Sequence, residues 1–148
     1  MKPKMINQQL TARMHESEKD NVGIIMDDLR AKGWTFFVTE TLCGRTNYRN
    51  RTCTVPVWAF NADNKAANGD TEYWLYYLSH EIAHAIRFEN YCDRHGRRNA
   101  LRGYGWRGND HGANFMAIFK QVCPTHLQHH ELGYKPRNAA AAGIRSKK

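Results

Sequence analysis

Apolar residues recur at a helical spacing near the start of the chain. The spacing i, i+3, i+4 and i+7 is one face of an α-helix. Between Ser17 and Ala31 these positions hold Val22, Ile25, Met26 and Leu29. Ser17 suits the N-cap, and Gly33 suits the position at which a helix stops. We therefore predict a first helix over residues 17–31 that turns one face toward a core.

The pattern then changes to alternation, which is the signature of β-strands. Apolar residues stand at every second position at Trp34, Phe36 and Val38, and again at Cys53, Val55, Val57 and Ala59. Residues 44–48 are a candidate for another strand. Pro56 lacks an N–H group, so the last strand should lie near an edge or be interrupted there. We expect a short three-stranded sheet of antiparallel type.

The next segment predicts a long helix over residues 71–88, with Asp70 as its N-cap. One face of this helix is apolar at Leu75, Leu78, Ile82, Ala85 and Ile86. Trp74 and three tyrosines make much of the remaining surface apolar as well. A helix that is apolar on most sides is a buried, central one. Polar side chains within it therefore need partners.

The rest of the chain is less regular. Residues 89–109 show no clear period, whereas residues 110–122 predict a further helix that ends before Pro124. A length of 148 residues suits one domain. We expect a single α+β domain at residues 1–134, followed by a basic, flexible tail at residues 135–148.

The central helix contains the segment His80-Glu81-Ile82-Ala83-His84. Residues four apart share one helix face, so both imidazoles can reach one ion. Zinc in catalytic sites takes three protein ligands and keeps one position for water, whose pKa falls toward ~7. Glu81 lies beside the pair and suits the role of general base. The motif therefore predicts a Zn²⁺ site that hydrolyses its substrate.

The third ligand has to come from another segment. The metzincin arrangement is excluded, because it needs Gly at position 87 and His at position 90, where this chain has Arg87 and Asn90. The remaining candidates are Glu131, His95, His111, His126, His129 and His130. We favour His111, since it begins the predicted later helix, Gly112 permits close backbone approach, and Phe115 can anchor the turn in the core.

These motifs together resemble the SprT-like zinc metalloprotease family, which includes the Spartan protease. The resemblance rests on His80-Glu81-x-x-His84-Ala85, on His111-Gly112-x-x-Phe115 and on Gly44-Arg45-Thr46 ahead of a hydrophobic strand, and it covers about residues 23–124. It implies a zincin-type domain with His80, His84 and His111 as zinc ligands and Glu81 as general base. It also implies a link to proteins crosslinked to DNA. The C-terminal Cys-x-x-Cys ribbon of many family members is missing here.

The charge of the chain favours an anionic partner. There are 22 Lys and Arg residues against 14 Asp and Glu residues, a formal net charge of +8. Basic and aromatic residues interleave in the segment before His111, where guanidinium groups suit phosphates and aromatic rings suit unpaired bases. The candidate surface for DNA or substrate consists of Arg94, Arg97, Arg98, Arg102, Tyr104, Trp106 and Arg107. The alternative is a solvated loop whose aromatic residues pack into the core.

The four cysteines form no Cys-x-x-Cys pair, and no apolar run approaches the ~20 residues that span a bilayer. We therefore expect the cysteines to be free thiols. We also expect the protein to be cytoplasmic and to have no membrane partner. A disulfide between Cys43 and Cys53 across a hairpin is the alternative. The histidines that follow Cys123 lack enough well-spaced ligands to predict a second metal site.

The leading hypothesis is a zinc endopeptidase that hydrolyses peptide bonds of protein substrates, with DNA-associated proteins among them. The oxyanion of such a reaction needs a further donor, for which the candidates are Tyr91, His95, Tyr104 and Arg107. Two alternatives are a DNA-binding protein with a structural zinc site and a His-metal nuclease. The sequence does not specify the oligomeric state.

Overall fold

The computed structural model describes residues 4–5, 18–107 and 111–131, with side chains described at residues 21–102 and 111–131. Predictions at three places lie outside the described residues: Ser17, Asp110 and the tail at 135–148. The same holds for the side chains of Tyr104, Trp106 and Arg107. The described residues form helices and a mixed sheet, which confirms the α+β class.

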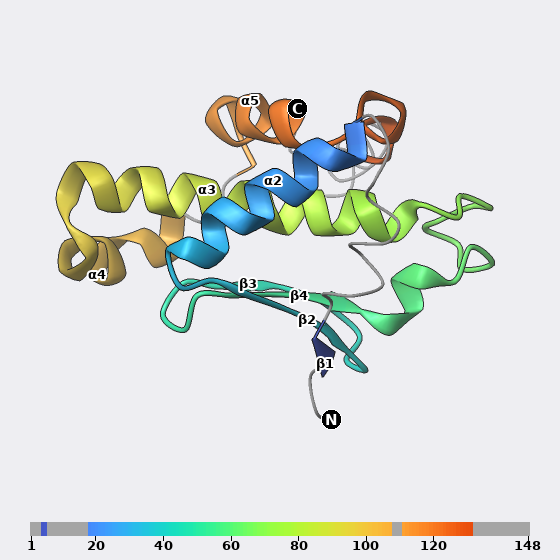
Figure 1. Cartoon of the computed structure of the whole chain (residues 1–148), viewed down its shortest axis with the longest axis horizontal. Coiled ribbons are helices and arrows are strands. Elements are labelled where there is room, and N and C mark those ends of the chain that lie inside the picture. The colour runs from blue at the N-terminus through green and yellow to red at the C-terminus, as the bar shows by residue number, and fades with distance from the viewer. Residues whose placement is uncertain (1–3, 6–17, 108–110, 132–148) are drawn as a thin grey trace, which may run out of the picture.

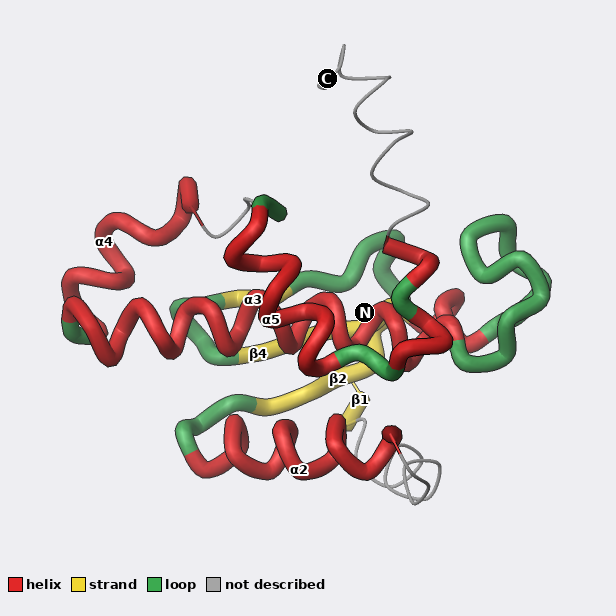
Figure 2. Tube along the Cα trace, turned by 90° about the horizontal axis from the view of Figure 1, so that it is seen from above, coloured by secondary structure: helices red, strands yellow, loops and turns green. Residues whose placement is uncertain are grey.

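The helices lie on one side of the sheet, and one long helix runs through the middle of the molecule (Figure 1). This central helix, α3 (Tyr73–His95), contacts the sheet through β4 and also contacts α2 (Glu18–Ala31), α4 (Arg97–Arg107) and α5 (Ala113–Val122). Seen from above, α5 lies over α3 and α2 runs along its flank (Figure 2). The central position that the apolar pattern predicted for this helix is confirmed.

The sheet is mixed, so the predicted antiparallel type is wrong. Four strands are described, β1 (Lys4–Met5), β2 (Thr35–Thr39), β3 (Thr46–Asn47) and β4 (Thr52–Pro56), in the order β1-β2-β4-β3. The central pair β2 and β4 is parallel, whereas β1 and β3 run antiparallel to their neighbours. An alternating pattern fixes which face a residue occupies but not the direction of its strand, which explains the error.

Two of the predicted element ends are confirmed. Helix α2 stops at Gly33, which has φ +102°. There Trp34 N–H donates to Leu29 C=O at 3.0 Å, and Gly33 N–H donates to Arg30 C=O at 2.9 Å. This pair of bonds is the Schellman arrangement, which favours glycine at the left-handed position. Strand β4 ends at Pro56, and residues 57–60 form a 3₁₀ turn instead of continuing the strand as far as Ala59.

Two helical segments extend beyond the prediction. Helix α3 continues past residue 88 to His95, and α4 occupies most of the segment that has no apolar period. In the described part of α4, Ala100 is buried and Leu101 is partly buried, whereas Arg98, Asn99 and Arg102 are exposed. A helix end with one small buried residue leaves no periodic stripe to detect. At the other end, Asp70 is not the N-cap of α3; its Oδ1 accepts a bond from Glu72 N–H at 2.8 Å in the turn before the helix.

The core fills the space between α3, the sheet and α5. Its largest fully buried side chains include Trp34, Trp74, Phe36, Phe88, Phe115 and Phe119. Its cysteines Cys53 and Cys123 are buried thiols, and no disulfide joins the chain's cysteines, as expected. Within the described ranges, none of the helices has the length and apolarity needed to cross a membrane.

Candidate metal centre

Helix α3 and the segment before α5 bring three imidazoles together. His80 and His84 lie one turn apart on α3, with ring centroids 5.0 Å apart. His111 precedes α5 and places its Nε2 3.1 Å from the Nε2 of His84. The ligating nitrogens of all three lie within 4.8 Å of one another. Two ligands on one tetrahedral zinc would be about 3.3 Å apart, so this cluster can hold a metal ion.

Phe115 supports all three rings from α5. Its ring centroid lies 5.0 Å from His80, 4.6 Å from His84 and 4.8 Å from His111, and the side chain is fully buried. Gly112 is the N-cap of α5, and its C=O accepts the Met116 N–H at 2.9 Å. The start of α5 thus fixes His111 against α3, with Phe115 as the apolar side of the cluster.

His80 is oriented by a buried carboxylate that sequence reasoning had considered only as a ligand. Glu131 places Oε1 2.8 Å from His80 Nδ1, and the Tyr76 hydroxyl donates to the same oxygen at 2.8 Å. Because an ionised carboxylate only accepts, Nδ1 is the donor, which leaves Nε2 as the atom of His80 that can bind an ion once it has lost its own proton. Glu131 therefore contacts a candidate ligand and is not one of the three grouped residues, an arrangement that is usual behind a metal-bound histidine.

Glu131 and His80 each favour the charged form of the other, as the directions of their pKa shifts show. Burial would raise the pKa of Glu131, but the hydrogen bond and charge of His80, helped by Tyr76 and His111, lower it. Burial would likewise lower the pKa of His80, and the bond to Glu131 with the charges of Glu81 and Glu131 raises it. Glu131 is only 2% exposed, so the charged carboxylate depends on these partners.

Glu81 is held against the sheet by Thr46. The Thr46 hydroxyl lies 2.7 Å from Glu81 Oε1 and 2.9 Å from the Glu81 carbonyl oxygen. Burial raises the pKa of Glu81, and the opposing effects of His80 and Thr46 do not cancel that rise. A buried carboxylate with a raised pKa accepts a proton more readily than an exposed one.

The position of Thr46 depends on a close contact at Gly44. A Cβ at Gly44 would overlap the Thr54 carbonyl oxygen, and the Gly44 N–H donates to the Tyr77 hydroxyl oxygen at 2.9 Å. Tyr77 belongs to α3, so this bond ties the start of β3 to the helix that carries Glu81. Gly44 and Thr46 were singled out in the sequence only through the family resemblance, because a contact across 35 residues leaves no local spacing to detect.

The other candidates for the third ligand lie elsewhere. His95 ends α3, eleven residues beyond His84 and therefore about 16 Å along the helix axis. His126 Nε2 is 2.8 Å from Glu72 Oε1, and His130 Nε2 is 2.7 Å from Asp70 Oδ2. His129 groups with Asp70 and His130. Of the histidines weighed, the structure brings His111 to the His80 and His84 pair.

Residues 94–107, here called the basic segment, form one end of the molecule (Figure 1). The side chains of Arg94, Arg98 and Arg102 are exposed. Arg97 is partly buried, and its Nη2 donates to the Arg49 carbonyl oxygen at 3.0 Å, which joins α4 to the turn after β3. The segment is helical rather than a loop, and of its described arginines Arg94, Arg98 and Arg102 face solvent whereas Arg97 packs against the turn.

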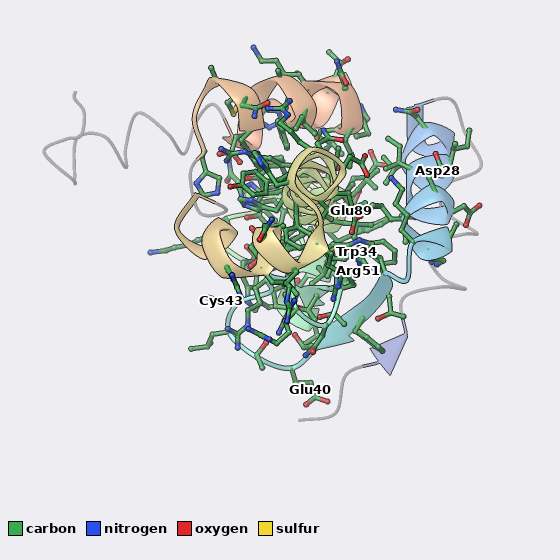
Figure 3. All side chains as sticks on the ribbon, turned by 90° about the vertical axis from the view of Figure 1, so that its left-hand side faces the viewer. Asp28, Trp34, Glu40, Cys43, Arg51 and Glu89 are labelled. Atoms are coloured by element: carbon green, nitrogen blue, oxygen red, sulfur yellow. The ribbon has the colours of Figure 1, made fainter. Side chains whose placement is uncertain are left out.

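Arg51 lies in the turn after β3, and its side chain forms an ion pair with a buried carboxylate. Its Nε lies 2.7 Å from Glu89 Oε2, and the Trp34 indole N–H donates to that oxygen at 2.8 Å. Figure 3 shows these three side chains meeting between α3 and the sheet. The bonds satisfy a carboxylate that is only 5% exposed, so Arg51 is committed to the core and not to a phosphate.

Comparison of the chain with protein-family models, with curated proteins and with solved structures found no match.

Proposed function

We propose that this protein is a zinc-dependent endopeptidase with a zincin-type site of the SprT-like kind. The observation that carries the proposal is the convergence of His80, His84 and His111 beside Glu81. Three imidazole nitrogens form a donor set that suits zinc and other borderline ions, whereas Mg²⁺ and Ca²⁺ prefer oxygen ligands. His80, His84 and His111 would hold the ion, with Glu131 fixing the ring of His80.

When bound, zinc supplies a Lewis acid that polarises the scissile carbonyl and acidifies a coordinated water. Glu81 would act as the general base that accepts a proton from the attacking water, and then as the acid that returns a proton to the leaving amine. Its raised pKa favours holding the proton between these steps. Thr46 keeps one carboxylate oxygen in place throughout. The residues of this chain thus provide both a fixed ligand set and a positioned base.

The proposal extends to substrates associated with DNA. The exposed arginines at the end of α3 and on α4 lie on a chain of net charge +8. Arginine pairs with phosphate oxygens at two points, which suits a nucleic-acid backbone. DNA would concentrate the enzyme near proteins bound or crosslinked to it, as the family resemblance implies.

The direct test is the variant Glu81→Gln, assayed on an unfolded protein with and without single-stranded DNA. We expect proteolysis to fall by about 10²–10⁴-fold, because the base is lost, while zinc content is unchanged. Glu40→Gln makes the same substitution at an exposed loop residue and should cleave like the parent (Figure 3). Cleavage at the parent rate by Glu81→Gln would contradict the proposed mechanism.

The basic surface equally favours the alternative of a DNA-binding protein with a structural zinc site. That alternative predicts one tightly held zinc at His80, His84 and His111, salt-sensitive DNA binding, and no cleavage by the parent protein under any condition. Proteolysis that disappears in Glu81→Gln distinguishes the two functions.

A further inference from the structure

A second cluster of ligating side chains lies at the other end of α3 from the basic segment. Asp70 precedes the helix, and His129 and His130 follow the 3₁₀ turn η2 (Thr125–Leu127). Their ligating atoms lie within 4.8 Å of one another. We propose that Asp70, His129 and His130 form a second metal site, which binds Zn²⁺ or another borderline first-row divalent cation.

His129 and Asp70 are each held by a backbone hydrogen bond that leaves a second ligating atom outside that bond. His129 Nδ1 is 3.0 Å from the His126 carbonyl oxygen. A carbonyl oxygen only accepts, so Nδ1 carries the proton and the Nε2 lone pair remains. Asp70 Oδ1 accepts the Glu72 N–H, which leaves Oδ2 toward His130. Such bonds set the tautomer and direction of metal ligands.

His130 is fixed by aromatic packing. Its ring centroid is 5.0 Å from that of Tyr73 at 90° and 5.2 Å from that of Tyr76. Its side chain is 9% exposed, that of Asp70 is 24% exposed, and His129 is exposed. The cluster is therefore rigid on its inner side and open to solvent on the side of His129, which gives an ion a route in and leaves positions for water.

The donor set decides which ions fit. Two imidazoles and one carboxylate are typical of Zn²⁺, Co²⁺ and Ni²⁺ sites, whereas Mg²⁺ and Ca²⁺ favour oxygen alone. The 2.7 Å contact between His130 Nε2 and Asp70 Oδ2 is a hydrogen bond in which Nε2 is the donor. Binding of the ion requires this proton to leave or to move to Nδ1, so metal uptake is coupled to proton release.

An ion at this site would link two segments that are far apart in the sequence. It would join the segment before α3 to the segment that contains Glu131, the carboxylate that contacts His80. His126 and Glu72 already bridge the same two segments at 2.8 Å. An ion held by the neighbouring residues 129 and 130 would fix the backbone that presents Glu131 to the first centre.

The test is zinc stoichiometry of the full chain, with zinc alone as the probe. Purified protein is loaded with zinc, dialysed against metal-free buffer and measured by native mass spectrometry and elemental analysis. We expect two ions per chain in the parent and one in His129→Gln, whose exposed side chain can be changed without opening the core. His126→Gln alters a histidine of the same segment outside the cluster and should retain two.

His111→Gln separates this inference from the proposed function. It should lose the first ion and retain the second, and the double variant with His129→Gln should bind none. One ion in the parent, retained in His129→Gln and lost in His111→Gln, would overturn the second site and leave the first centre intact. One ion lost in His129→Gln and retained in His111→Gln would support the second site and contradict the first.

Discussion

Each of the two histidine clusters of this protein contains a close contact between a histidine and a carboxylate, but the carboxylate has a different place in each. In the first, Glu131 contacts His80 Nδ1 at 2.8 Å and is not one of the grouped ligating residues. In the second, Asp70 contacts His130 Nε2 at 2.7 Å and is itself one of the grouped ligating residues. A carboxylate behind a ligand tunes an ion, whereas a carboxylate in the ligand set binds it. Short distance to a histidine does not by itself separate these roles.

The surroundings of the clusters differ as well. The first cluster packs on the buried ring of Phe115, and Glu81, which follows His80 in the chain, is buried as well. The second lies at the rim, with His129 exposed. Electrostatic interactions are stronger where water is excluded, and the buried His84 and Phe115 make the first cluster the more enclosed of the two. The second has the surroundings of a structural ion.

The largest effect is expected from His111→Gln. Removing the ligand that α5 contributes leaves two imidazoles on α3, so the first centre should lose its ion and all proteolysis. Circular dichroism should show a folded protein, because His111 lies before α5 and outside the apolar core. Proteolysis that survives in this variant would mean that the third ligand is another residue.

The next largest effect is expected from Phe115→Ala. The ring is fully buried and touches all three histidines, so its loss should lower the free energy of unfolding by about 3–5 kcal/mol. Urea denaturation measures the change. Met116→Ala is the control one residue along α5, at a partly buried position, and should cost less. An equal cost for the two variants would contradict the role of Phe115 as the support of the cluster.

A smaller effect is expected from Glu131→Gln, which keeps the shape of the side chain but removes its charge. Zinc affinity at the first centre should fall by about 10–100-fold, or about 1.4–2.7 kcal/mol, because His80 loses its ionic partner. Competition with a chelator of known affinity measures this. If affinity is unchanged while Glu40→Gln also binds normally, Glu131 does not orient the ligand.

The smallest effect is expected at the basic end of the molecule. Arg98→Ala should weaken binding of single-stranded DNA by less than about 1.4 kcal/mol and reduce the dependence on salt by about one phosphate contact. Fluorescence anisotropy across a salt series measures both. Lys65→Ala removes an exposed charge from the loop at the opposite end and should change neither (Figure 1). Equal losses in both variants would indicate attraction by net charge rather than a surface on α4.

Local spacing explains which parts of this molecule were predictable. His80 and His84 were placed on one face because the helix repeat alone sets their separation. The end of α2 at Gly33 follows from backbone geometry at a single residue. His111 was favoured over other histidines because Gly112 and Phe115 described a helix start that enters the core, and the structure places it beside His84.

The remaining features depend on residues far apart in sequence. Glu131 reaches His80 across 51 residues and Asp70 reaches His130 across 60, so neither contact has a spacing that a helix or strand would impose. The parallel pairing of β2 with β4 is decided by the path of the intervening hairpin rather than by the alternation within either strand. Helix α4 has Ala100 as its described buried residue and therefore lacks an apolar stripe.

The most direct measurement is anomalous X-ray scattering from a zinc-loaded crystal, recorded on both sides of the zinc absorption edge. We expect a zinc peak ~2.0–2.1 Å from one nitrogen of each of His80, His84 and His111. Water should complete the coordination, and Glu81 should lie next to it. A strong peak elsewhere, with these three rings free of metal, would contradict the assignment of this cluster as the catalytic centre.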